Sequence, residues 1–393
     1  MSNSVELELY GCMHDHSGYA VHTRAVARSL INAGFRVRLV CYNNTKPLPF
    51  PDLEPYRKIK LKPRYPIIRL IMLPPHPVYQ QRRYTILYTM IETQSMHPGV
   101  IQRCSTADEV WTPNPDNVVQ FRKHLHNSMP VYHMPEGTDP VLYSSSGPVA
   151  FDRDAYDFIA CSVFAWQWRK GPDILLRAWM KAFTPKDKVR LLIRSSVVAV
   201  NKSTGRRIIR EAVESAKTDT GVKDFAPIQI IEDPIPDEDI PKLYRSCDCF
   251  VLPTRGEGWC LPALDAMACG CVPVVTKTGG LQSFCTSSNS VQIKPGKPVV
   301  FKPDEFRLMN FFDDQTFHNP SPDDLAAALK KLKSNSERLK KLSNQGSEYA
   351  RSHFSWNRSN QPIINRILEI HKNIHPKAKN NKSEESCTKS QSI

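Results

Sequence analysis

The stretch Thr254-Arg-Gly-Glu-Gly-Trp-Cys-Leu-Pro-Ala-Leu-Asp-Ala-Met-Ala-Cys-Gly270 decides how this chain folds. It follows an apolar run, Phe250-Val-Leu-Pro253, which predicts a buried strand, and its second half predicts a short helix. Pro262 suits the beginning of that helix, where a missing N–H costs nothing, and Gly270 suits a left-handed exit. A strand, a glycine-containing loop and a helix in this order are typical of the ligand-binding edge of a parallel α/β sheet.

The loop combines features of an anion site with two acidic side chains. Gly256 and Gly258 allow the backbone to come close to a ligand. The helix start presents free N–H groups and the positive end of its dipole, which favours a phosphate. Glu257 lies in the loop and Asp265 on the helix. The arrangement indicates a sugar-nucleotide site, and the alternative is an ordinary strand–turn–helix with two solvated acids.

The segment resembles the Glu-x7-Glu signature of retaining GT-B glycosyltransferases of the family 4 type, the glycosyl transferases group 1. Asp265 stands where that family has its second Glu. The resemblance implies that Glu257 contacts hydroxyls of the donor sugar and that Asp265, shorter by one methylene, holds the ribose of the nucleotide. It also implies donor contacts for the neighbouring loop residues Gly256, Gly258, Trp259, Cys260 and Leu261.

A second segment, residues 158–179, resembles the strand, loop, Lys-Gly and helix that open the second domain of that family. The resemblance implies that Lys170 meets the donor diphosphate, where neutralising negative charge on the leaving group stabilises the transition state. The family usually has an arginine about six residues earlier, and this chain has Phe164 there. Arg169 is the candidate to supply the missing cation, because its fork of donors suits phosphate. The alternative for both cations is a solvated basic turn.

Two positions in the first half complete the predicted site. Gly18 follows the first predicted strand and resembles the glycine whose backbone approaches the donor in that family. Glu92 comes directly after the predicted strand 84–91, at the edge where α/β sheets bind ligands. We therefore predict that Glu92 contacts the acceptor or the sugar.

Strand and helix patterns alternate along the chain, which predicts parallel sheets covered by helices. The residues 44–83 are rich in Pro, Lys and Arg and predict a long irregular insertion. The fold class is therefore α/β of the GT-B type, with two doubly wound Rossmann-like domains facing each other across a cleft.

The predicted boundaries are an acceptor-side domain over 1–150, a nucleotide-sugar-binding domain over 151–352, a helix crossing back to the first domain over 353–375, and a disordered tail over 376–393. The predicted strands of the first half are 4–10, 36–41, 84–91, 108–112 and 131–134, and those of the second half are 157–164, 188–195, 227–231, 248–253 and 272–275.

Composition restricts the class of protein. The 393 residues are 40% hydrophobic and 23% charged, as in globular proteins with ordinary cores, and no apolar run approaches the length of a membrane span. The first residues lack a basic-then-apolar signal, so we expect a cytoplasmic protein. The eleven cysteines lie in apolar surroundings, which favours reduced core thiols and argues against a metal site.

The formal net charge of +14 attracts anionic partners. Because no nucleic-acid-binding signature accompanies it, we expect a phosphorylated donor as the partner and no nucleic acid. Peripheral contact with an anionic membrane stays open.

The sequence therefore predicts a retaining glycosyltransferase that moves a sugar from a nucleotide-diphosphate sugar to a hydroxyl acceptor. The resemblance implies no cofactor and no metal, with the nucleotide sugar as co-substrate. Two alternatives remain. One is a GT-B sugar-nucleotide epimerase or hydrolase, and the other is a degenerate GT-B protein that binds sugar nucleotide or glycan without transfer. Asp265 and Phe164 are the departures from the family pattern that keep the second alternative open.

Overall fold

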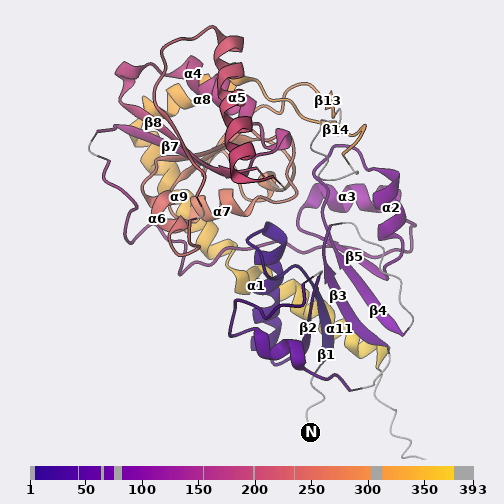
Figure 1. The fold of residues 1–393 in the computed structure, drawn as a ribbon. Coiled ribbons are helices and arrows are strands. Elements are labelled where there is room, and N and C mark those ends of the chain that lie inside the picture. Colours follow the sequence, from indigo (N-terminus) through magenta and orange to yellow (C-terminus); the bar gives the residue numbers. More distant parts are fainter. Residues whose placement is uncertain are drawn as a thin grey trace, which may run out of the picture.

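The computed structural model describes residues 5–42, 44–62, 66–74, 82–153, 155–197, 200–233, 235–301 and 312–375. Two six-stranded sheets organise these residues, and both are parallel throughout. They form two lobes (Figure 1). The predicted tail over 376–393 lies outside the described residues.

The first sheet has the strand order β2-β1-β3-β4-β5-β6. Its strands are β1 (Glu6–Gly11), β2 (Arg36–Cys41), β3 (Ile67–Met72), β4 (Arg83–Tyr88), β5 (Glu109–Thr112) and β6 (Val131–His133). Its connections contain α1 (Gly18–Asn32), the 3-10 turn η1 (Glu54–Lys58), α2 (Pro98–Cys104) and α3 (Pro115–His124). Ser17 caps α1 by accepting a hydrogen bond from the Ala20 amide.

The second sheet has the order β12-β11-β10-β7-β8-β9. Its strands are β7 (Phe158–Ala165), β8 (Val189–Ser196), β9 (Ile228–Ile231), β10 (Cys249–Leu252), β11 (Val272–Thr276) and β12 (Val291–Ile293). Its helices are α4 (Pro172–Ala182), α5 (Lys202–Thr220), α6 (Ile240–Arg245), α7 (Leu261–Ala268), α8 (Pro322–Lys333) and α9 (Ser336–His353), with the 3-10 turns η2 (Trp168–Lys170), η3 (Pro185–Asp187) and η4 (Gly279–Ser283). A short antiparallel pair, β13 (Val299–Val300) and β14 (Thr316–Phe317), stands apart from this sheet.

The prediction of an irregular insertion over 44–83 is wrong for Ile67–Met72. This segment is β3, which lies between β1 and β4 in the first sheet. A strand covered on both faces is a continuous apolar run, and here Arg69 interrupts that run. The guanidinium of Arg69 lies 2.6 Å from the buried carboxylate of Glu8 on β1, so its partner comes from the neighbouring strand. Positions 43, 63–65 and 75–81 are outside the described residues.

The chain returns to the first domain after α9, through α10 (Trp356–Ser359) and α11 (Gln361–Ile374). The buried face of α11 carries Ile363, Ile367 and Ile370, which pack into the same core as Leu7 and Leu9 of β1. Figure 1 shows α11 against the first sheet although it comes last in the described sequence. No helix in the described ranges is both long enough and apolar enough to span a membrane.

Candidate active site

The predicted loop leads from β10 into α7 at the junction of the two domains. Pro262 is the second residue of α7, one position later than the sequence predicts, and Gly270 takes the predicted left-handed conformation with φ 81°. Cys260 precedes the helix with φ 92°, a left-handed conformation that is unusual for a residue with a β-carbon. Thr254 donates a hydrogen bond of 3.0 Å to Glu257, which ties the loop to its own acid.

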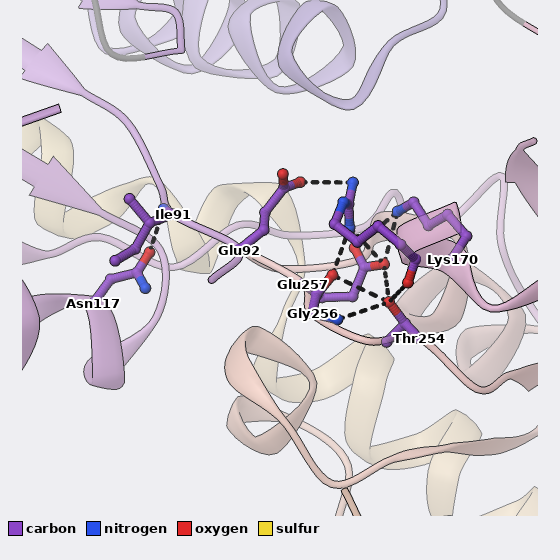
Figure 2. A network of polar contacts seen from close by, with 8 residues as sticks. Ile91, Glu92, Asn117, Lys170, Thr254, Gly256 and Glu257 are labelled. Atoms are coloured by element: carbon purple, nitrogen blue, oxygen red, sulfur yellow. Dashed lines mark hydrogen bonds and ion pairs between the residues drawn. The ribbon is translucent and has the colours of Figure 1, made fainter. Parts of the chain in front are cut away.

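Glu257 is the centre of a buried ion-pair cluster, and 3% of its side chain is exposed. Lys170 donates from Nζ to both carboxylate oxygens, at 2.8 and 2.9 Å. Arg169 lies 3.1 Å from the same carboxylate. Burial raises the pKa of Glu257, but the charges of Lys170 and Arg169 outweigh burial, so that the pKa lies below its ordinary value. The carboxylate is therefore ionised. Figure 2 shows dashed lines from it to Lys170 and to Thr254.

Arg169 also joins the two domains. Its guanidinium lies 2.8 Å from the carboxylate of Glu92, which reaches across from the end of the first sheet (Figure 2). It donates a further hydrogen bond to the Gly256 carbonyl. Burial alone would lower the pKa of Arg169, but Glu92 and Glu257 raise it, so the side chain keeps its charge. The structure thus brings Glu92, Arg169, Lys170 and Glu257 together, and both predicted phosphate cations already face carboxylates.

The loop glycines make room for the other domain. A β-carbon on Gly256 would lie 1.8 Å from the Glu92 carbonyl oxygen, and one on Gly258 would lie 2.3 Å from the sulfur of Met90. The Gly258 carbonyl accepts a buried hydrogen bond of 3.0 Å from Asn114 of the first domain. In the Cβ direction the close neighbour of both glycines is the first domain, and their predicted contact with a donor stays a prediction.

A first cavity of about 590 Å³ lies between the start of α1 and the start of α7. Gly18 lines it from the first domain, and Leu261 and Asp265 line it from the second. Of the predicted donor residues these three border this cavity, and Lys170 and Arg169 do not.

Asp265 has an unusual charge state for an acid beside a cavity. It accepts a hydrogen bond of 2.6 Å from the Thr138 hydroxyl. Burial raises the pKa of Asp265 to about 8, and the nearby charges of Asp139, Glu136 and Asp237 act in the same direction, while the bond from Thr138 opposes them. The carboxyl therefore holds its proton at neutral pH and can donate a hydrogen bond to a hydroxyl or a phosphate.

A second cavity has a volume of about 300 Å³. Glu92 and Glu257 both line it, together with Asp116 from α3 and His318 from the end of β14. Burial lowers the pKa of His318, so that this ring is neutral at neutral pH. Its lining contains three carboxylates and no Lys or Arg among the described residues.

Two residues that were predicted to contact the sugar donor, Trp259 and Cys260, have their side chains in the core of the second domain. The Trp259 ring is buried against the rings of Phe284 and Phe354, at centroid distances of 5.4 and 5.8 Å. The Cys260 side chain is buried in the same core of the second domain, and neither residue lines either cavity. The side chains of these two residues therefore belong to the core, and a donor contact from either residue would be made by its backbone.

Sequence reasoning missed several residues that the fold brings to the site. Thr138, Asn114 and Arg194 come from strand ends or their loops, where parallel sheets place ligand-binding residues. The only signal for Asn114 is the Asn-Pro pair, which here caps α3. Within the described ranges, no group of three or more His, Cys, Asp or Glu side chains has the arrangement of a metal site.

Two facing parallel sheets with a buried acid–base cluster at their junction define a two-domain α/β protein of the GT-B class. Comparison with solved structures confirms this fold. Sucrose-phosphate synthase from Thermosynechococcus elongatus superposes with a TM-score of 0.69 at 16% sequence identity, covering 94% of this chain and all of that one. The Anabaena protein HepE in complex with UDP-glucose superposes with a TM-score of 0.63 at 13% identity, covering 93% of this chain and 99% of that chain.

Sequence comparison points to the same family. Residues 155–302, the greater part of the second domain, match the family described as Glycosyl transferases group 1, in agreement with the resemblance found in the sequence. The D-inositol 3-phosphate glycosyltransferase of Segniliparus rotundus is 33% identical over 112 residues, or 28% of this chain and 23% of that protein. The mannosylfructose-phosphate synthase of Agrobacterium fabrum is 26% identical over 198 residues, or 50% of this chain and 37% of that protein. The matches thus span less than half the length of these curated relatives.

Proposed function

We propose that this protein is a retaining glycosyltransferase that moves a sugar from a nucleotide-diphosphate donor to a hydroxyl acceptor. The observation that carries the proposal is the cluster of Glu257, Lys170, Arg169 and Glu92 at the junction of the two domains. A cavity of about 300 Å³ is lined by both carboxylates of the cluster, and a cavity of about 590 Å³ is bordered by the start of α7, the helix that follows the Glu257 loop. The named relatives, which are glycosyltransferases and sugar-phosphate synthases, support the same class of reaction.

In this proposal the first cavity takes the nucleotide diphosphate. Gly18 and the start of α7 supply backbone N–H groups, and the protonated Asp265 supplies a hydroxyl to the ribose. The volume of the cavity is in the range of small-molecule sites. The second cavity takes the hydroxyl acceptor, with Glu92 and Glu257 as hydrogen-bond acceptors for sugar hydroxyls.

The reaction that fits is a front-face displacement. The bond between the anomeric carbon and the phosphate oxygen breaks, the acceptor oxygen bonds to the same face of that carbon, and its proton passes to the departing phosphate oxygen. Lys170 stays paired with Glu257 and, in this proposal, acts on the leaving group only through its positive charge, without direct contact, as that group becomes more negative. Contacts between the domains exclude water and so limit hydrolysis of the donor. We expect the chain's own cations to neutralise the leaving group, so activity should persist in EDTA.

The test is a thermal-shift panel of UDP-, GDP- and ADP-sugars, followed by product analysis with the donor that binds. Binding to the folded state raises the melting temperature by mass action. Transfer with retention is expected, and NMR of the product gives the configuration at the anomeric carbon. Nucleotide release without any acceptor would identify a hydrolase or epimerase, and binding without turnover would identify a binding protein. A chain that no sugar nucleotide stabilises would contradict the proposed function.

A further inference from the structure

The phosphates of a donor need cations that are free to bind them, and the two cations expected from the sequence are engaged. Lys170 bonds to both oxygens of Glu257, and Arg169 pairs with Glu92 and Glu257. Neither lines the first cavity. A diphosphate in that cavity would therefore find its first unengaged cation elsewhere.

Most basic side chains around the first cavity already have partners. His16 lies 3.1 Å from Asp237, and Arg28 lies 2.7 Å from Asp52. Arg24 donates to the main-chain carbonyls of Met13 and Asp15. These three side chains are held by the protein, and a ligand would have to compete for them.

Arg194 differs from these three. Its Nε atom is buried and has no hydrogen-bond partner, and no described residue forms an ion pair with its guanidinium. The carboxylates of the cavity are engaged elsewhere, since Asp265 accepts from Thr138 and Asp237 faces His16. A buried donor without a partner is costly, so this Nε atom, on a half-buried side chain that lines a cavity, indicates a site completed by a ligand.

The position of Arg194 suits such a ligand. It lies at the carboxyl end of β8, paired in register with Val163 on β7, and both residues line the first cavity. The carboxyl ends of parallel strands are where doubly wound sheets bind nucleotides. An arginine offers five donors in a planar fork, which matches the oxygens of a phosphate better than the single point charge of a lysine.

We propose that Arg194 binds a phosphate group of the nucleotide diphosphate in the first cavity and is the cation that anchors the donor there. This inference rests on the proposed function, because it assumes that a nucleotide occupies this cavity. It assigns the anchoring of the diphosphate to a residue of β8, and leaves Lys170 and Arg169 to the ion-pair cluster with Glu257.

The experiment compares Arg194→Ala and Arg194→Lys with the wild-type chain. The ligands are the nucleoside diphosphate that binds the wild type best among UDP, GDP and ADP, and the matching nucleoside, each titrated by calorimetry. We expect Arg194→Ala to weaken binding of the diphosphate by about 10- to 100-fold, the usual effect of losing a charge-assisted hydrogen bond. Binding of the nucleoside should change less than about twofold. The diphosphate affinity of Arg194→Lys should lie between those of the wild type and Arg194→Ala, because lysine keeps the charge but not the planar fork of donors.

Arg190→Ala is the matched control. Arg190 lies on the same strand, bonds to Gln229 and does not line the cavity, so its loss changes net charge equally without reaching the ligand. Equal weakening of nucleoside and diphosphate by Arg194→Ala would overturn the proposal in favour of a base contact. Unchanged diphosphate affinity in Arg194→Ala would also overturn it. A wild type that binds none of the three diphosphates would instead refute the proposed function, and the two failures are thus separate.

Discussion

The first and second cavities share the segment from β10 to α7 as a wall, but side chains of different charge line them. The first has Arg24, Arg28 and Arg194 beside Asp139, Asp237 and Asp265. The second has Glu92, Asp116 and Glu257, and no Lys or Arg among the described residues of its lining. A phosphate is attracted to the arginines of the first cavity, whereas the carboxylates of the second accept hydrogen bonds from neutral hydroxyls. Under the proposed function, this difference in charge separates the anionic part of the donor from the hydroxyl-bearing acceptor.

The largest effect is expected from Glu257, because it lines the second cavity and holds Lys170 and Arg169. Glu257→Ala would leave two buried cations without this carboxylate, at a cost of about 3–5 kcal/mol in the free energy of unfolding. We expect transfer to fall by about 100-fold or more, since the charges around the leaving group are no longer held in place. Transfer rates and urea unfolding measure the two losses.

Glu257→Gln tests the same idea in a chain with less disturbance of packing. The amide keeps the size of the side chain and an oxygen for the Thr254 hydroxyl, but it loses the negative charge. Transfer should still fall, with a smaller loss of stability. Glu238→Ala, at an exposed position on the second domain, is the control for removing an acid. A wild-type transfer rate in Glu257→Gln would show that transfer does not depend on the negative charge of Glu257.

The acceptor preference gives the next effect in size. A phosphate monoester in the second cavity would face three carboxylates, of which Asp116 has no cation beside it among its recorded contacts. We therefore expect a neutral sugar to be used at least about tenfold better, in kcat/KM, than the same sugar carrying a phosphate. Asp116→Asn should narrow that ratio. A preference for the phosphorylated acceptor would contradict the idea that the acidic lining of the second cavity excludes phosphates.

The pH dependence of stability tests the first cavity. The pKa of Asp265 is raised from 3.8 to about 8, so the folded state keeps a proton that the unfolded state has lost over this range. Unfolding then releases a proton, and the contribution of Asp265 to stability falls as the pH rises from about 4 to 8. Asp265→Asn removes this dependence, so the stability of the variant relative to wild type should increase by at least about 1 kcal/mol between pH 5 and pH 8.

Urea unfolding at the two pH values measures that difference. Asp224→Asn, which changes an exposed acid, should give the same difference from wild type at both. If Asp265→Asn behaves like Asp224→Asn, then the carboxyl is not protonated in the folded protein at neutral pH.

Local signals explain why the second domain was predicted better than the first. Its strands from β7 to β11 are apolar runs bounded by glycine, proline or charged turns, and the predicted and observed bounds differ by one residue at most positions. One strand was missed in each sheet: β12 in the second, and β3 in the first, where Arg69 and the surrounding prolines hide a buried strand. The partner that makes Arg69 acceptable is Glu8, about sixty residues earlier in the sequence, and nothing local indicates that pair.

The same division applies to the site. Glu257 and Lys170 could be predicted because each belongs to a motif on one side of the junction. The contact of Arg169 with Glu92 could not, because it exists only where the two domains meet. Arg194 belongs to no recognisable sequence motif. Only the pairing of β8 with β7 in the folded sheet shows that it lines the first cavity.

Cys260 gives the smallest expected effect and tests the wall that both cavities share. Its φ of 92° is strained for any residue with a β-carbon, and the strain lies directly before the helix start that borders the first cavity. Cys260→Ala and Cys260→Gly both remove the sulfur, but only Ala keeps the β-carbon. We expect the Gly variant to be more stable than the Ala variant by about 1 kcal/mol. At Cys269, a buried position with φ −78° at the other end of α7, the order should reverse by about 0.5–1 kcal/mol, because Gly there only adds freedom to the unfolded chain. Urea unfolding of the four variants gives both differences. The same order at both positions would show that the left-handed backbone at Cys260 carries no strain.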